Sequence, residues 1–250
     1  MASYEDILRS LPTDVRAKYM ESSKRMVPGM LRLRFGVDEI RDEDEPRVPR
    51  TTASQHVAKL ANDAMRAWED IHTAHWSSVA DTSTDKRAAY LRSAQFAKKQ
   101  LQRISAAEDE ALSLIEEKSK HLATVLGNAR KPPSNVGDAM IDSEVRAMIK
   151  AAKNGTEADA IARAHPRAVA SAPPVASGLS EDVHGKYVRQ YLQQVEPEHL
   201  ADQDDLRAAL GQLTKATTEL KKEANALIDF DSAARMEKFA GWIPPQRDAA

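Results

Sequence analysis

Apolar residues recur along most of this chain at intervals of three and four positions, the spacing of one helix face. Residues 51–79 follow this period, and residues 85–128 follow it throughout. A repeat of 3.5 residues kept over such a length indicates helices that pack along their sides, as in a coiled coil. The short polar segment between the two stretches therefore predicts an antiparallel helical hairpin over residues 51–130.

The second helix of this hairpin carries one apolar seam that is interrupted by Glu108 and Lys118. Such polar positions fix register or oligomeric state, or their side chains reach solvent along the helix surface, and the sequence leaves both accounts open. A second seam lies near the carboxyl end. We expect the seams to bury helix faces, either within one chain or between chains. The interface candidates in them are Leu101, Ile104, Ile115 and Leu122, and then Leu206, Leu210, Leu213 and Leu220.

Residues 30–36, MLRLRFG, alternate between apolar and basic side chains, which places Leu31, Leu33 and Phe35 on one side of an extended chain. This alternation is the one strand signal in the sequence, and an isolated strand needs a partner. Two interpretations stay open: a strand that pairs with another copy or another protein, or an irregular apolar loop that rests on the helices. On the first interpretation, the three apolar side chains belong to an interface.

Residues 164–180, AHPRAVASAPPVASGLS, are small, proline-punctuated and almost uncharged. Their composition is that of a tether, and adjacent prolines favour extended polyproline II geometry. We interpret the segment as an extended arm that becomes ordered on a neighbouring subunit. Its interface candidates are Pro173, Pro174 and Val175.

These features predict an all-α fold: a long antiparallel helical hairpin with coiled-coil-like packing, plus shorter helices and extended arms. Residues 1–50 form an amino-terminal helical arm and connector, residues 51–130 the hairpin, and residues 131–250 a carboxyl-terminal helical unit. Aromatic residues make up only 5% of the chain, and alanine is abundant, as is typical of long helices. In the tail, Phe239 and Trp242 are expected to dock on this chain or on another.

The sequence offers little that could carry catalysis. It has no cysteine, no nucleophile elbow and no phosphate-binding loop. The sharpest metal candidate is Glu69 with His72, spaced i,i+3 as in di-iron helical bundles, and His121 would have to join them. The second motif, Glu117 with His121, has a spacing of four instead of three. We therefore expect a protein that is not an enzyme, with no cofactor and no small-molecule substrate; a bundle metalloprotein is the enzymatic alternative.

The charge pattern narrows the class of partner. The formal net charge is −2, and no apolar run is long enough for a membrane span. The amino terminus does not resemble a signal peptide. The helix predicted over 85–128 is basic in its first half and acidic in its second, so its acidic half would repel a nucleic acid backbone. We expect protein partners and no direct contact with nucleic acid or membrane.

Residues 144–180 read EVRAMIKAAKNGTEADAIARAHPRAVASAPPVASGLS, and an amphipathic helix and a charged seam follow. This succession resembles small helical proteins encoded among the virion genes of tailed bacteriophages. The resemblance implies a structural role in a virion, with other copies of the chain or other virion proteins as partners, and it assigns no functional residue. A cytoplasmic location, and an adaptor or effector type of helical binding module in a bacterium, remain the alternatives.

Overall fold

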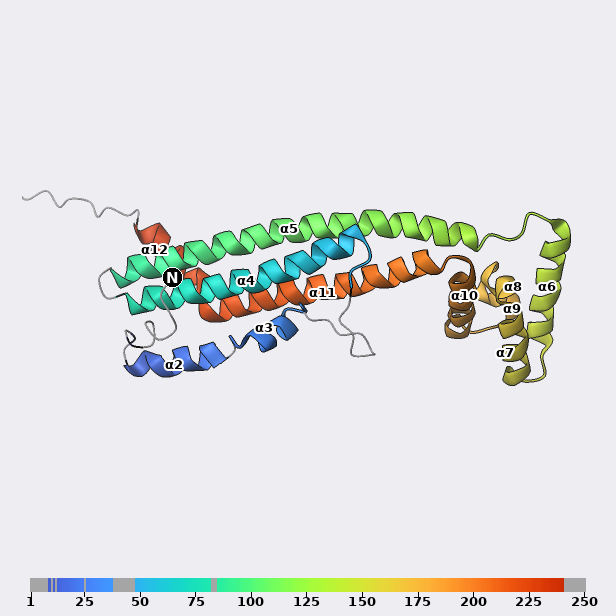
Figure 1. Cartoon of the computed structure of the whole chain (residues 1–250), viewed down its shortest axis with the longest axis horizontal. Helices are drawn as coiled ribbons and strands as arrows, with labels where there is room; N and C mark the ends of the chain where they lie inside the picture. The colour runs from blue at the N-terminus through green and yellow to red at the C-terminus, as the bar shows by residue number, and fades with distance from the viewer. Residues whose placement is uncertain are drawn as a thin grey trace, which may run out of the picture. The chain divides into compact units, whose positions relative to one another are not determined.

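The computed structural model describes residues 9, 11, 13–24, 26–37, 48–81 and 85–240, and Figure 1 shows that these residues form helices and no strand. The all-α prediction is therefore confirmed. Trp242 and the side chain of Phe239 lie outside the described part of the chain. The helices are α2 (Thr13–Lys24), α3 (Pro28–Arg34), α4 (Thr52–Ala80), α5 (Lys86–Ala129), α6 (Val136–Ala151), α7 (Gly155–Ala164), α8 (Pro166–Ala170), α9 (Pro174–Ser177), α10 (Glu181–Val195), α11 (Pro197–Leu227) and α12 (Phe230–Ala240).

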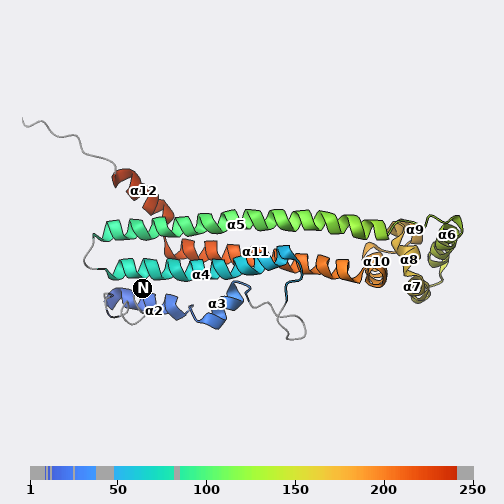
Figure 2. The same ribbon diagram turned by 45° about the horizontal axis from the view of Figure 1, so that its top comes forward.

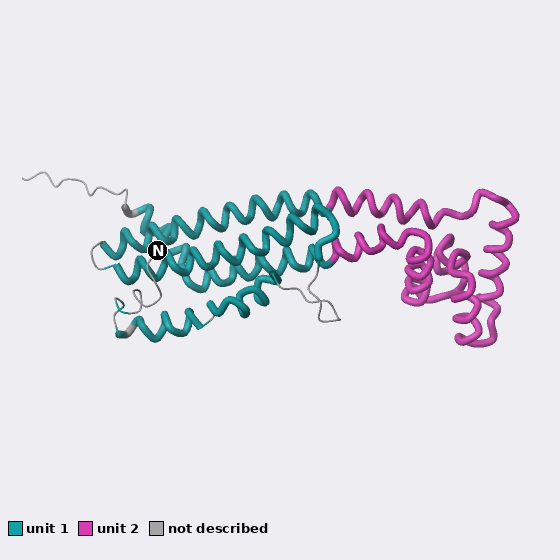
Figure 3. The backbone as a smooth tube through the Cα atoms, in the orientation of Figure 1, with its two compact units in different colours: residues 1–115, 208–250 teal, residues 116–207 magenta. Residues whose placement is uncertain are grey.

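The chain divides into two compact units, which Figure 3 distinguishes by colour. Unit 1 consists of residues 1–115 and 208–250, and unit 2 of residues 116–207. Both α5 and α11 contribute residues to each unit, because each long helix runs through a unit boundary. The divisions predicted at residues 50 and 130 do not coincide with these boundaries.

In unit 1, α4 and α5 form the predicted antiparallel hairpin (Figures 1 and 2). The rings of His75 and Tyr90, both near the turn, have centroids 6.4 Å apart. Farther from the turn, Nε2 of His56 lies 3.9 Å from a carboxylate oxygen of Glu110. As the residue numbers increase along α4, the numbers of the contacting residues decrease along α5, so the two helices are antiparallel. Residues of α4 are buried around most of the helix, so it is the central helix of this unit.

The last part of α11 is the third long helix of unit 1, and it runs antiparallel to α5. The hydroxyl of Thr217 donates a hydrogen bond of 2.8 Å to Glu108, and the hydroxyl of Tyr90 donates one of 3.1 Å to the carbonyl of Asp229. Figure 2 shows α4, α5 and this part of α11 side by side. The apolar seams that the sequence contains therefore close within a single chain in this unit.

The helix α3 docks on α11 through a charge cluster in unit 1. Nε of Arg34 donates a hydrogen bond of 2.8 Å to Glu219, and the same guanidinium forms an ion pair with Glu223, which is buried. The side-chain amide of Gln212 donates a hydrogen bond of 2.6 Å to the carbonyl of Gly36. An ion pair between a half-buried arginine and a buried glutamate holds two helices in one register, because separating them leaves the buried carboxylate without a partner.

The prediction of a strand or loop at residues 30–36 is wrong, because the segment belongs to α3 and its C-terminal cap. In a helix, Leu31 and Phe35 lie one turn apart on the same face, and both are completely buried. Leu33 then points to the opposite side and is 59% exposed. Gly36, with φ of 66°, ends the helix in the left-handed conformation, and the N–H of Val37 donates to the carbonyl of Arg32.

Unit 2 is built around Tyr187 of α10, whose side chain is completely buried. The hydroxyl of Tyr187 donates a hydrogen bond to the carboxylate of Asp159 on α7. Burial, and then this neighbouring carboxylate, raise the pKa of Tyr187 to about 12, so the phenol keeps its proton and remains the donor. The apolar side chains of this core are Val145, Ile149, Ala162, Ala168 and Val169.

Residues 164–180 do not form an extended arm; they make the end of α7, then α8 and α9, within unit 2. Their small side chains let neighbouring helices approach closely, and Ala168, Val169 and Ala170 are buried. Side chains of other helices satisfy the carbonyls of this segment. Arg146 donates to Ala168 at 2.9 Å, and Nε2 of His184 donates to Val169 at 3.1 Å and to Ala172 at 2.9 Å.

Two leucines on α11 test the packing of unit 1. Leu220 is completely buried, whereas Leu210 is 43% exposed. We expect Leu220→Ala to lower the free energy of unfolding by roughly 2–5 kcal/mol, because it removes buried surface and leaves a cavity. Leu210→Ala, the matched control, should change it by less than about 1 kcal/mol. Urea denaturation followed by circular dichroism measures both, and equal losses would contradict the packing described.

Candidate functional site

Most of the predicted seam residues are buried inside the chain. Ile104, Ile115, Leu122, Leu206, Leu213 and Leu220 are buried, and Leu101 is half-buried. Leu210 is the exception, since Ala209 occupies the buried position beside it. The buried leucine and isoleucine side chains are therefore internal contacts and form no surface open to a partner.

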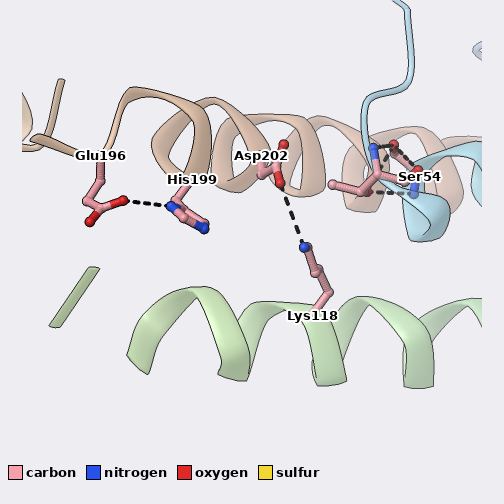
Figure 4. Close-up of polar contacts among 6 residues, drawn as sticks. Ser54, Lys118, Glu196, His199 and Asp202 are labelled. Atoms are coloured by element: carbon pink, nitrogen blue, oxygen red, sulfur yellow. Dashed lines mark hydrogen bonds and ion pairs between the residues drawn. The ribbon is translucent and has the colours of Figure 1, made fainter. Parts of the chain in front are cut away.

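The two charged seam positions of α5 are paired with α11 inside the chain. In unit 1, Lys221 donates to the carboxylate of Glu108 at 2.9 Å, in addition to the bond from Thr217. In unit 2, Nζ of Lys118 lies 3.7 Å from a carboxylate oxygen of Asp202, as Figure 4 shows. Of the two accounts left open by the sequence, the structure favours the one in which polar seam residues fix register.

The described part of unit 2 leaves one helix with a row of exposed apolar side chains. On α6, Val136 is 73% exposed, Met140 60%, Ile141 53% and Met148 56%. At about 100° per residue, these four positions span about 140° of the helix circumference, while Val145 and Ile149 face the core. We call these four residues the α6 face. Exposed apolar side chains gathered in this way are characteristic of a surface that binds another protein.

Sequence reasoning assigned no special role to the α6 face. The apolar residues of α6 occupy a wider arc of the helix than its one contact with the core of unit 2 can cover. The signal was the width of the stripe: Met140 and Ile141 are adjacent, so both cannot face the centre of the same core. Of the candidates in residues 164–180, Pro173 and Val175 are exposed and Pro174 is half-buried.

A second notable group is the buried cluster of histidine and aromatic rings in unit 1. Nε2 of His72 lies 3.1 Å from Oγ of Ser22, and that hydroxyl donates to the carbonyl of Tyr19. His72 is therefore the donor, with its proton on Nε2. The rings of Tyr19 and Trp76 meet edge to face, with centroids 5.2 Å apart, and join α2 to α4.

The metal site suggested by Glu69, His72 and His121 is not formed. His72 is buried against aromatic rings, whereas His121 is exposed on the part of α5 that belongs to unit 2. Within the described residues, no group of three or more histidine, aspartate or glutamate side chains is placed to hold a metal ion.

The buried histidines make the stability of unit 1 depend on pH. Burial lowers the pKa of His75 to about 4 and that of His72 to about 4, the latter with a smaller contribution from His75. Both histidines have a pKa near 6.5 in the unfolded chain. Between pH 6.5 and 4 the unfolded chain therefore binds more protons than the folded chain does. The contribution of the two neutral histidines to the free energy of unfolding is complete above about pH 6.5 and is lost as the pH falls toward 4.

We expect the free energy of unfolding to fall by on the order of 2 kcal/mol for each histidine between about pH 7.5 and 5. Urea titrations at the two pH values measure the loss. The double variant His72→Gln, His75→Phe should lose most of this pH dependence, and His121→Gln, at an exposed position, should keep it. A double variant with the full pH dependence of the wild type would contradict the assignment.

Comparisons with known proteins give no relative: no family model, no curated protein and no solved structure matches this chain. None of the described helices combines the length and the apolar character that crossing a membrane requires.

Proposed function

We propose that this chain is a non-enzymatic assembly protein that binds a second copy of itself through the α6 face. The observation that carries the proposal is the exposure of Val136, Met140, Ile141 and Met148 on one side of a helix whose other side is buried in unit 2. Methionine side chains are flexible and polarisable, which suits them to a contact between helices. Burying this apolar surface against another helix would remove it from water and stabilise the complex.

The charges along α6 favour a second copy as the occupant. Asp138 lies in the first turn of the helix, whereas Lys150 in the last turn and Lys153, just beyond the end, are basic. Two α6 helices that lie antiparallel bring the acidic part of each beside the basic part of the other, and their helix dipoles also oppose. A parallel arrangement would place like charges together. We therefore propose an antiparallel contact with two-fold symmetry.

The finer proposal is that the assembly is the particle of a tailed bacteriophage. It rests on the resemblance noted for residues 144–180, which in the fold run from the middle of α6 through α9. In that setting the partners also include other virion proteins, and the protein is located in the virion.

The proposal predicts concentration-dependent association. Light scattering on the eluting peak should give a mass near 27.6 kDa when dilute and a rise toward twice that value as the loading concentration goes from roughly 5 to 500 µM. The double variant Ile141→Glu, Met148→Glu should weaken association by at least about tenfold, because it places charges in the apolar contact.

The matched control is Leu112→Glu, since Leu112 is also an exposed apolar residue (41%) inside a helix, but lies on α5 in unit 1. It should associate as the wild type does, and all variants should keep their helical circular dichroism. A wild type that stays monomeric over the whole range would overturn the proposal. So would a double variant that associates as strongly as the wild type.

A further inference from the structure

Unit 2 contains a hollow of about 430 Å³ between the end of α5, α10 and the start of α11. Its apolar wall includes Leu126, Leu192 and Leu200, which are buried and pack on one another. Two helical glycines, Gly127 and Gly185, also line it, and a Cβ built at either would meet no atom within 4 Å. The volume falls in the range of small-molecule sites, about 300–1,000 Å³.

The polar lining of the hollow is strongly cationic. The residues around it include Arg130, Arg189 and Arg207 and no carboxylate. Nη1 of Arg189 donates to Asp204 at 3.0 Å, and Nη1 of Arg207 lies 3.9 Å from the same carboxylate, so one aspartate is shared by two guanidinium groups. The three arginines and Asp204 together leave about two positive charges at the hollow.

The arginines remain accessible to a ligand. Arg130, in the turn after α5, donates from Nε to the carbonyl of Ala170 at 3.2 Å and is half-buried. The side chain of Arg207 is 70% exposed and that of Arg189 54%. Their guanidinium groups can therefore approach a bound anion from solvent without first breaking the core of unit 2.

We propose that this hollow binds a small organic anion with an apolar body. Its carboxylate or phosphate group meets the guanidinium groups of Arg130 and Arg207, and its apolar part lies on Leu192 and Leu200. Guanidinium groups match the planar oxygen pairs of carboxylates and phosphates, and a site of this kind combines an apolar wall with a few charged donors. The site is separate from the α6 face and goes beyond the proposed function.

Calorimetric titration of the full chain with sodium octanoate and with octyl phosphate tests the proposal. Both are expected to bind saturably with one site per chain, and 1-octanol, which has the same apolar body without the charge, should bind at least about tenfold more weakly. Saturable binding of only one of the two anions identifies the head group that the site takes. Absence of saturable binding for both anions would overturn the proposal.

Variants locate the ligand in the hollow. Arg207→Gln should weaken octanoate binding by about tenfold and the double variant with Arg130→Gln by more, whereas Lys131→Gln, on an exposed neighbour of Arg130, should leave it unchanged. Gly185→Leu fills the hollow and should abolish binding. Gly211→Leu is its matched control, because Gly211 is also an exposed helical glycine with no atom within 4 Å of a Cβ. If the arginine variants or Gly185→Leu bind as the wild type does, the assignment is wrong.

Discussion

The fold of unit 1 depends on the antiparallel packing of α11 against α5. The hairpin of α4 and α5 carries more apolar surface than its two helices can cover for each other, and the buried leucines of α11, Leu213 and Leu220, complete the core. Glu108 fixes the register, because its carboxylate accepts from both Thr217 and Lys221. A shift of one helical turn would leave that half-buried carboxylate without its donors.

The sequence was sufficient to predict the long helices and their direction. A period of 3.5 residues leaves few alternatives for residues 51–128, and the short polar turn implies an antiparallel pair. It could not reveal that α11 closes the seam inside the chain. The seam of α11 and that of a second molecule would present the same apolar repeat, and only the three-dimensional path of the chain decides between them.

The two wrong predictions, a strand or loop at residues 30–36 and an extended arm at residues 164–180, have different physical causes. The prolines of residues 164–180 predict an extended chain, yet Pro166 and Pro174 each occupy the first position of a helix, where the missing N–H is no loss. At residues 30–36, the alternation of apolar and basic residues does not distinguish a strand from a helix. Leu31 and Phe35 are four positions apart, so they lie on one side of a strand and also on one face of a helix. The glycine that follows, Gly36, was the available helix-ending signal.

The candidate sites were less predictable than the fold because they depend on which faces stay uncovered. The width of the apolar stripe on α6 was visible in the sequence, whereas the arginines at the hollow come from the turn after α5, from α10 and from α11, and share no sequence motif. The buried histidines illustrate the same point, since their neighbours Tyr19 and Trp76 come from separate helices.

The discontinuous path of unit 1 affects how the chain is made. Residues 116–207 form unit 2 as a single stretch, but unit 1 needs residues 208–227, which leave the ribosome only after unit 2 has been synthesised. The nascent hairpin of α4 and α5 therefore waits on the order of ten seconds for its third helix at usual rates of translation. During that interval its apolar stripe is open to chaperones and to other nascent chains.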